Sequence, residues 1–205
     1  EISVRDWSSD VCSSDLTSFT VDAWVKIAGF PSASQGSGMI FFRGDSRPAL
    51  DPYFLYSAPG GKVGFHIESA TGTVVQIEAN APANQWIHVA GTFDNATDSM
   101  RLYVNGGLVA QQTTTVVPMT NLTGANPGVG IGNIHVTPFS VPFNGLIDEV
   151  ELFGRALTQA EVEGLYFAGV AGKCKPDADA DGVTDALDAC PGTPTGTTVN
   201  AQRSD

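Results

Sequence analysis

Short segments in which apolar and polar residues alternate follow one another along most of the chain. This two-residue period is typical of strands that bury one face. Turns rich in Gly, Asn and Pro separate the segments, without long helical patterns between them. The sequence therefore predicts an all-β fold, an antiparallel jelly-roll β-sandwich. The predicted strands lie at 19–27, 38–43, 53–57, 62–68, 73–78, 85–93, 100–104, 108–112, 128–132 and 145–153.

Two turns and one helix interrupt this pattern. Asn105-Gly106 is a strong signal for a tight hairpin, and 69–72 predicts another. Thr158, followed three residues later by Glu161, forms a capping box. It predicts one short C-terminal helix, which we expect to cap one edge of the sandwich. The apolar stripe of this helix consists of Val162, Leu165 and Tyr166.

Four sequence blocks occur in the order seen in laminin-G-like domains. They are 19–25 (FTVDAWV), 86–94 (WIHVAGTFD), 102–106 (LYVNG) and 144–158 (NGLIDEVELFGRALT). The resemblance implies the concanavalin A-like jelly-roll fold, and we place this domain at 17–170. It says less about function, because lectins, adhesion modules and glycoside hydrolases share the fold.

Asp148 is a candidate calcium ligand on the strength of the same resemblance. In calcium-dependent members of this fold, an Asp in the corresponding Ile-Asp-x-Val strand ligates a structural calcium together with backbone carbonyls. The alternative is a carboxylate that accepts hydrogen bonds from backbone amides at a strand edge.

The carboxylates that glycoside hydrolysis would need form an incomplete pattern. Hydrolases of this fold use Glu-x-Asp-x-Glu or Glu-x-Asp-x-x-Glu, and here Leu146 occupies the position of the first Glu. Glu149 and Glu151 are expected on one strand face, as solvent-facing carboxylates. His66 and His88 fall inside predicted strands, which favours structural roles. We therefore predict no catalytic residues and no enzyme activity.

Asp alternates with small residues along 177–188, in the manner of a calcium loop. Such a loop of about twelve residues supplies oxygen ligands from its first, third, fifth, seventh, ninth and twelfth positions, with Gly at the sixth. Gly182 is in the sixth position, and Val183 offers its backbone carbonyl at the seventh. The sequence therefore predicts Ca²⁺ as a cofactor. The predicted ligands are Asp177, Asp179, Asp181, Val183, Asp185 and Asp188.

Prolines flank this acidic loop where a helix-loop-helix calcium site would need helices. Pro176, Pro191 and Pro194 exclude regular helices. With Cys190-Pro191 behind it, the loop resembles a thrombospondin type 3 repeat, which implies an extracellular, calcium-wrapped segment. We place a truncated repeat at 174–200. A dockerin, which needs a second loop and a following helix, is the alternative.

Cys174 and Cys190 flank the acidic loop and are candidates for a disulfide. On the chain-entropy model such a bridge would stabilise the loop by about 3 kcal/mol. A free or metal-binding pair is the alternative, as is a bridge from Cys190 to a cysteine further along the natural chain. The oxidised form implies an extracellular or cell-surface location.

The first sixteen residues are expected to be an artefactual leader. The stretch 10–16 (DVCSSDL) resembles the translation of a common sequencing-adapter end, and 5–9 is its usual companion. Such segments are excluded from reasoning about the fold. We therefore give Trp7 and Cys12 no functional role.

The formal net charge of −12 argues against nucleic acid as a partner, because phosphates need Lys and Arg. No apolar run reaches the roughly eighteen residues of a membrane span. The sequence thus predicts an extracellular calcium-binding adhesion or recognition module of a larger surface protein, with a carbohydrate or extracellular protein as ligand. The ligand-binding residues are unknown, although the loops 44–53 and 133–139 are candidates. The alternatives are a structural spacer in an adhesin or envelope protein, or a non-catalytic fragment of a glycoside hydrolase.

Overall fold

The computed structural model describes residues 16–44, 51–120, 122, 128–134 and 140–168. The chain divides into two compact units, residues 1–163 and 164–205, and all the strands belong to the first. The predicted calcium loop, with Cys174 and Cys190, lies outside the described residues, as does most of the expected leader. Leu16, the last residue of that leader, is described and packs against the domain core.

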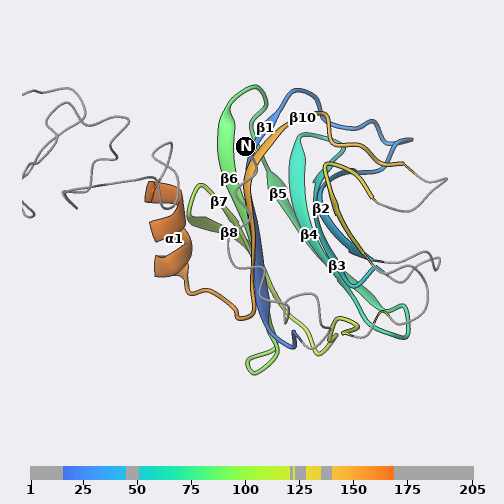
Figure 1. The fold of residues 1–205 in the computed structure, drawn as a ribbon, viewed down its shortest axis with the longest axis vertical. Helices are drawn as coiled ribbons and strands as arrows, with labels where there is room; N and C mark the ends of the chain where they lie inside the picture. The colour runs from blue at the N-terminus through green and yellow to red at the C-terminus, as the bar shows by residue number, and fades with distance from the viewer. Residues whose placement is uncertain (1–15, 45–50, 121, 123–127, 135–139, 169–205) are drawn as a thin grey trace, which may run out of the picture. The chain divides into compact units, whose positions relative to one another are not determined.

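Within the described residues, ten strands form two five-stranded sheets whose pairings are all antiparallel (Figure 1). The strands are β1 (Phe19–Ile27), β2 (Gly38–Gly44), β3 (Tyr53–Ala58), β4 (Lys62–Glu68), β5 (Val74–Asn80), β6 (Trp86–Asp94), β7 (Ser99–Val104), β8 (Gly107–Thr113), β9 (Gly128–Ile131) and β10 (Gly145–Phe153). The first sheet has the order β10-β1-β6-β7-β8, and the second has the order β5-β4-β3-β2-β9. The predicted antiparallel sandwich is confirmed, and each predicted strand overlaps an observed one.

The two sheets share one hydrophobic core, to which regular strands contribute alternate side chains. On β1, the side chains of Val21, Ala23 and Val25 lie in this core and have no exposed surface. Asp22 and Trp24 fall between them, so the pleat turns these side chains to the outer face of the first sheet. The same alternation gives the second sheet an outer face of its own.

The two predicted hairpin turns are confirmed. Asn105 and Gly106 join β7 to β8 with φ of 52° and 77°, the positive values that a two-residue hairpin turn needs. Between β4 and β5, Gly72 has a φ of 78°, and the amide of Ser69 donates to the carbonyl of Thr73 over 3.0 Å. The second turn sets the register of β4 with β5, whereas the register of β7 with β8 shifts between Leu102 and Tyr103.

A β-bulge on β2 changes which of its side chains face the core. The register with β3 shifts between Met39 and Phe41, so both Ile40 and Phe41 lie in the core. As a result Met39 and Phe42 belong to a separate apolar cluster on the outer face of the second sheet.

A second bulge lies on β10, where the register with β1 shifts opposite Ala23. Glu149 is the extra residue and has a φ of 48°, and Val150 enters the core. Glu151 pairs with Asp22, whose side chain belongs to the outer face. The expectation that Glu149 and Glu151 share a regular strand face is therefore not met, because the bulge breaks the two-residue period.

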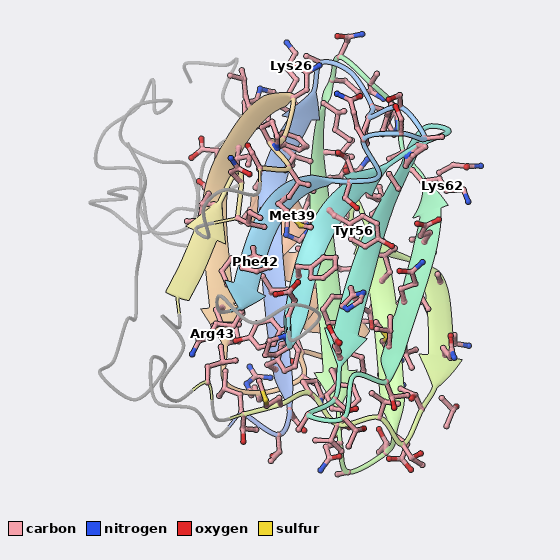
Figure 2. The ribbon with its side chains drawn as sticks, turned by 90° about the vertical axis from the view of Figure 1, so that its right-hand side faces the viewer. Lys26, Met39, Phe42, Arg43, Tyr56 and Lys62 are labelled. Atoms are coloured by element: carbon pink, nitrogen blue, oxygen red, sulfur yellow. The ribbon has the colours of Figure 1, made fainter. Side chains whose placement is uncertain are left out.

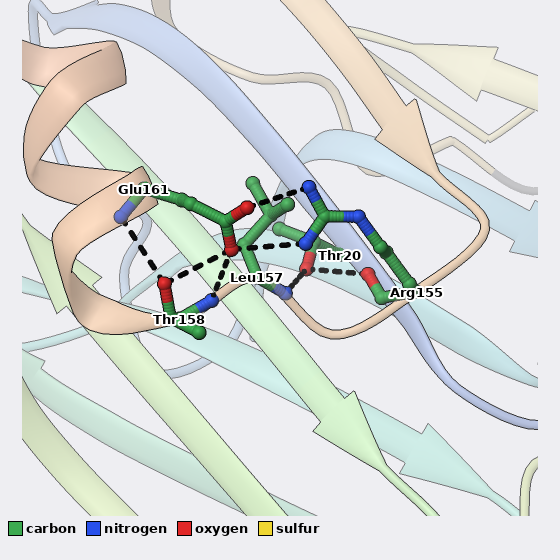
Figure 3. A network of polar contacts seen from close by, with 5 residues as sticks. All are labelled: Thr20, Arg155, Leu157, Thr158 and Glu161. Carbon is green, nitrogen blue, oxygen red and sulfur yellow. Dashed lines mark hydrogen bonds and ion pairs between the residues drawn. The ribbon is translucent and has the colours of Figure 1, made fainter.

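The predicted capping box is confirmed at the start of α1 (Gln159–Ala168), as Figure 3 shows. The backbone amide of Thr158 donates to Glu161 over 2.8 Å, and the amide of Glu161 donates to the hydroxyl of Thr158 over 3.3 Å. The guanidinium of Arg155 donates to both oxygens of Glu161, over 2.9 and 2.7 Å. These bonds, that from Arg155 foremost, hold the pKa of Glu161 at about 2.

Thr20 on β1 fastens the segment that leads into this helix. Its hydroxyl donates to the carbonyl of Arg155 over 3.0 Å and accepts from the amide of Leu157 over 2.8 Å (Figure 3). Leu157 and Val162 are both buried. The start of the helix is therefore fixed beside β10 and β1, at one edge of the first sheet.

Candidate ligand-binding face

The outer face of the second sheet carries two neighbouring rows of side chains (Figure 2). Cross-strand pairing aligns the first row as Phe42, Phe54, His66 and Gln76. It aligns the second row as Met39, Tyr56, Gly64 and Glu78. Aromatic, imidazole, amide and carboxylate groups are therefore brought to one face by β2, β3, β4 and β5.

The aromatic residues of this face form a cluster that is distinct from the core between the sheets. The ring of Phe54 stacks on that of His66, with centroids 4.0 Å apart and an interplanar angle of 13°. The ring of Tyr56 meets Phe54 edge-on, with centroids 5.4 Å apart. The sequence pattern predicted these strands but did not reveal this second cluster, because the β2 bulge decides which rings leave the core.

Tyr56 reaches across β4 to Glu78 on β5. A Cβ atom on Gly64 would lie 2.4 Å from the Tyr56 ring, so the ring can cross β4 only above a glycine. The Tyr56 hydroxyl donates to one oxygen of Glu78 over 3.0 Å, and Lys62 donates to the other over 3.1 Å. Burial and the carboxylate of Glu78 raise the pKa of Tyr56. Glu78 is thus held by partners of its own.

His66 and Glu68 are buried on the same face but lack a full set of hydrogen bonds. His66 Nε2 lies 3.8 Å from Glu68 Oε2, beyond hydrogen-bond distance, and the two residues are 7% and 4% exposed. Glu68 Oε2 accepts from the amide of Asp51 over 3.2 Å. Within the described part of the chain, neither ring nitrogen of His66, nor Glu68 Oε1, has a hydrogen-bond partner of ordinary geometry, although Gln76 lies near enough to affect the pKa of His66. A buried polar group without a partner costs about 1–3 kcal/mol, and this face carries three such atoms beside its aromatic cluster.

Burial also sets the protonation of this pair. Burial lowers the pKa of His66 to about 4, and a smaller effect of the Gln76 side chain raises it. Burial also raises the pKa of Glu68. The imidazole is therefore neutral at pH 7, with one nitrogen as donor and the other as acceptor. Together with Glu68 Oε1, the face offers both donors and acceptors to a bound molecule.

The low pKa of His66 predicts that stability depends on pH. Between pH 6.5 and about 4 the unfolded chain binds a proton that folded His66 does not, so the free energy of unfolding falls as the pH falls through this window. The full effect is about 3 kcal/mol, since each pKa unit corresponds to about 1.4 kcal/mol. Urea denaturation from pH 7 to 4.5 should show a shallower loss in His66→Gln than in the wild type.

Because the pKa of Glu68 is raised in the folded chain, Glu68 makes the free energy of unfolding rise as the pH falls toward the ordinary pKa of a Glu. Both proteins contain Glu68, so the difference between them isolates the contribution of His66. Equal pH dependence in the two proteins would contradict the low pKa assigned to His66.

The ends of the predicted loop 44–53 border this face. The amide of Asp51 donates to the Glu68 side chain, and the amide of Glu68 donates to the carbonyl of Pro52 over 2.9 Å. Tyr53, the last residue of this range, begins β3 and lies in the core, with its ring centroid 4.2 Å from that of Phe19. Residues 45–50 lie outside the described part.

The described ends of the second predicted loop, 133–139, also border the face. Asn133 Oδ1 accepts from the amides of Ile134 and Val141, over 2.9 and 2.8 Å. The second bond joins the residue that begins the loop to the segment that follows it. Ile134 and Val141 pack against the outer apolar cluster. Residues 135–139 lie outside the described part. Both candidate loops thus begin and end beside the same face.

His88 differs from His66 because it has a partner. Its Nε2 lies 2.8 Å from Asp22 Oδ2, and neither residue has exposed surface. The pair joins β6 to β1 on the outer face of the first sheet, where Trp24 packs beside His88 with centroids 5.7 Å apart. This arrangement agrees with the structural role predicted for His88.

Asp148 is exposed on β10, an edge strand, and its Oδ1 accepts from the amide of Glu149 over 2.9 Å. This is the strand-edge arrangement that the sequence left open as the alternative. Among the described residues, no three His, Cys, Asp or Glu side chains gather closely enough to hold a metal ion. The calcium role of Asp148, which relies on backbone carbonyls, stays a prediction. Within the same residues no helix is long and apolar enough to cross a membrane.

Two antiparallel sheets, a shared core and one short helix define a lectin-type β-sandwich, the class to which the sequence blocks pointed. Residues 6–163 match the family model described as the Concanavalin A-like lectin/glucanases superfamily. The chain belongs to this family. The match covers the whole sandwich and begins inside the expected leader. No curated protein matches the chain.

Several solved structures share this fold. Ruminococcus gnavus IT-sialidase CBM40 bound to alpha2,3 sialyllactose has a TM-score of 0.64 at 18% identity, over 77% of this chain and 85% of that one. The botulinum neurotoxin serotype G binding domain has a TM-score of 0.59 at 16% identity, over 78% and 38%. A heptameric SAP-like pentraxin from Limulus polyphemus has a TM-score of 0.56 at 18% identity, over 73% and 70%. At these identities the likeness shows a common fold.

Proposed function

We propose that this domain is a non-catalytic carbohydrate-recognition module whose ligand binds the outer face of the second sheet. The observation that carries the proposal is the pair His66 and Glu68, buried with unpartnered polar atoms beside an aromatic cluster. Sugars offer hydroxyl groups that donate and accept, together with apolar C–H faces that pack on aromatic rings. A site with few placed polar groups among apolar ones suits such ligands.

The carboxylates of this domain support binding rather than hydrolysis. Glycoside hydrolases need two carboxyl groups that face the scissile bond from opposite sides. Glu78 is held by Tyr56 and Lys62, and Glu149 lies at the bulge of β10, with a φ of 48°. A solved structure of similar fold carries sialyllactose as its ligand, which supports a sugar as ligand class for this fold.

The test is a glycan array, probed with the full chain, with His66→Ala and with Gln111→Ala as a matched control on the exposed side of the first sheet. The wild type and Gln111→Ala should bind the same glycans, and His66→Ala should lose at least tenfold in signal. Circular dichroism checks that each variant is folded. Absence of binding by the wild type, or unchanged binding by His66→Ala, would refute the proposal.

The calcium loop and the extracellular location enter the same proposal on sequence grounds alone. Five Asp side chains in 177–188 would repel one another without a cation, and Cys174 and Cys190 suit an oxidising compartment. In this proposal calcium orders the segment that follows the sandwich, and the sandwich binds the glycan.

Calcium binding is tested by isothermal titration. The wild type should bind Ca²⁺, and Asp181→Ala should weaken binding at least tenfold, because it removes one carboxylate from the predicted ligand set. Asp98→Ala, which changes an acidic residue of the sandwich, is the charge-matched control and should bind as the wild type does. Equal affinity in Asp181→Ala and the wild type would exclude this loop as the calcium site. Glycan arrays in chelator then show whether sugar binding needs the ion.

A further inference from the structure

A pocket of about 290 Å³ lies away from the His66–Glu68 pair, at one end of the sandwich. The loop between β1 and β2 forms one wall, and the segment that leads into β10 forms another. The pocket is lined by uncharged hydroxyl and amide groups and by apolar side chains. The polar groups belong to Ser34, Gln35, Ser37, Ser57, Ser140 and Asn144, and the apolar surface comes mainly from Phe30, Pro31, Val141 and Pro142.

Backbone hydrogen bonds hold these walls in place. The amides of Ala28 and Gly29 donate to the carbonyl of Asn144, over 2.9 and 3.4 Å. The amide of Met39 donates to the carbonyl of Val141 over 2.9 Å, which ties the second wall to β2. A Cβ on Gly29 would lie 2.8 Å from the side-chain nitrogen of Asn144, so a glycine leaves room for that amide. The pocket is therefore formed before any ligand binds, which lowers the entropic cost of binding.

Several polar groups in the pocket remain available to a ligand. Gln35 Oε1 accepts from the amide and the hydroxyl of Ser32, each over 2.9 Å, which fixes the side chain and leaves its NH₂ group unused. The side chains of Ser37 and Asn144 make no hydrogen bond to any described residue. The pocket therefore offers a ligand amide donors, amide acceptors and a hydroxyl group, together with the side chain of Phe30.

The absence of charge among the lining residues restricts the ligand. The chain has a net charge of −12, yet the described residues that line the pocket are all uncharged. A carboxylate or an ammonium group would lose hydration there without gaining an opposite charge, which is costly. The volume lies at the lower end of the range of about 300–1,000 Å³ that ligand pockets span, so a single ring fits better than a long chain.

We propose that this pocket is a second subsite, which binds one uncharged sugar ring and rejects acidic sugars. The assignment of a sugar rests on the carbohydrate-recognition function proposed above, whereas the selection for an uncharged, hydroxyl-rich ring follows from the lining alone. Because the described lining residues include no carboxylate, in this proposal the sugar binds there without calcium. A glycan that also contacted the outer face would be held at two points of one domain.

The test is titration of the isotope-labelled full chain with neutral monosaccharides, glucose, galactose and N-acetylglucosamine, and with glucuronic and sialic acids, all in chelator. Two-dimensional NMR observes the side-chain NH₂ signals of Gln35 and Asn144 directly. At least one neutral sugar should shift both signals, with at least tenfold weaker binding in Asn144→Ala and in Gln35→Ala. His66→Ala, on the other site, should leave these shifts unchanged. The acidic sugars should leave both signals unmoved.

The outcomes separate the two proposals. Shifts confined to residues of the outer face would overturn the pocket subsite and leave the carbohydrate-recognition function standing. Shifts confined to the pocket would support the subsite and overturn the outer face as the binding site. Equal binding of acidic and neutral sugars in the pocket would overturn the selectivity, and no shift with any sugar would overturn the subsite.

Discussion

Replacement of Asp22 by Ala is expected to lower the free energy of unfolding by about 1–3 kcal/mol. The substitution leaves His88 buried without the carboxylate that lies 2.8 Å from its Nε2. Neither residue has exposed surface, so water cannot replace the lost partner without opening the fold. Urea denaturation at pH 7, monitored by circular dichroism, measures the loss. Lys26→Ala, on the same strand, is the control and should change stability by less than about 1 kcal/mol.

A double-mutant cycle tests whether the pair itself is responsible. If the pair acts as a unit, His88→Ala should cost little further once Asp22 is already Ala, so the two effects should not add. Additive losses, or a cost of less than about 1 kcal/mol for Asp22→Ala, would contradict the structural role given to this pair.

Replacement of His66 by Phe is expected to have opposite effects on stability and on function. Phe keeps the stacking on Phe54 and removes two buried nitrogens that lack hydrogen-bond partners. The free energy of unfolding should therefore rise by about 1–3 kcal/mol. Glycan binding to the outer face should be lost, because the groups that would contact the sugar hydroxyls are gone. Thermal unfolding and the glycan array measure the two effects on the same protein.

His66→Gln serves as the matched comparison, because it retains one donor and one acceptor. It should keep more of the binding than His66→Phe and gain no stability. A Phe variant that is less stable than the wild type would show that the nitrogens are satisfied in the native state. A more stable variant that still binds glycan would remove His66 from the ligand-binding site.

The strands could be predicted from the sequence because their signals are local. A two-residue period on 19–27, the Asn105-Gly106 turn and the capping box at Thr158 each depend on residues a few positions apart. The fold confirmed all three. The ordered laminin-G-like blocks likewise indicated the family before any geometry was known, and the family model matches residues 6–163.

The residues of the candidate ligand-binding face could not be predicted from such local signals. Tyr53 and Tyr56 belong to one predicted strand, yet Tyr53 lies in the core, whereas Tyr56 lies with Phe42 on an outer face. The β2 bulge is responsible for part of this difference, since one extra residue reverses the face of the side chains that follow. The local signal that this outer face is polar consists of polar residues at alternate positions of two strands, Lys62, His66 and Glu68 on β4 and Gln76, Glu78 and Asn80 on β5.

The two strand histidines show where sequence reasoning ends. By itself the sequence determined an antiparallel sandwich, its turns, its short helix and an acidic segment suited to calcium. Both His66 and His88 occupied similar alternating segments, so the sequence could not tell them apart. Only the tertiary structure decided that His88 meets Asp22, 66 positions earlier in the chain, while the ring nitrogens of His66 find no partner of ordinary geometry among the described residues. Strand periodicity depends on neighbours in sequence, whereas the pairing of a buried polar group depends on which strands the sheet order brings together.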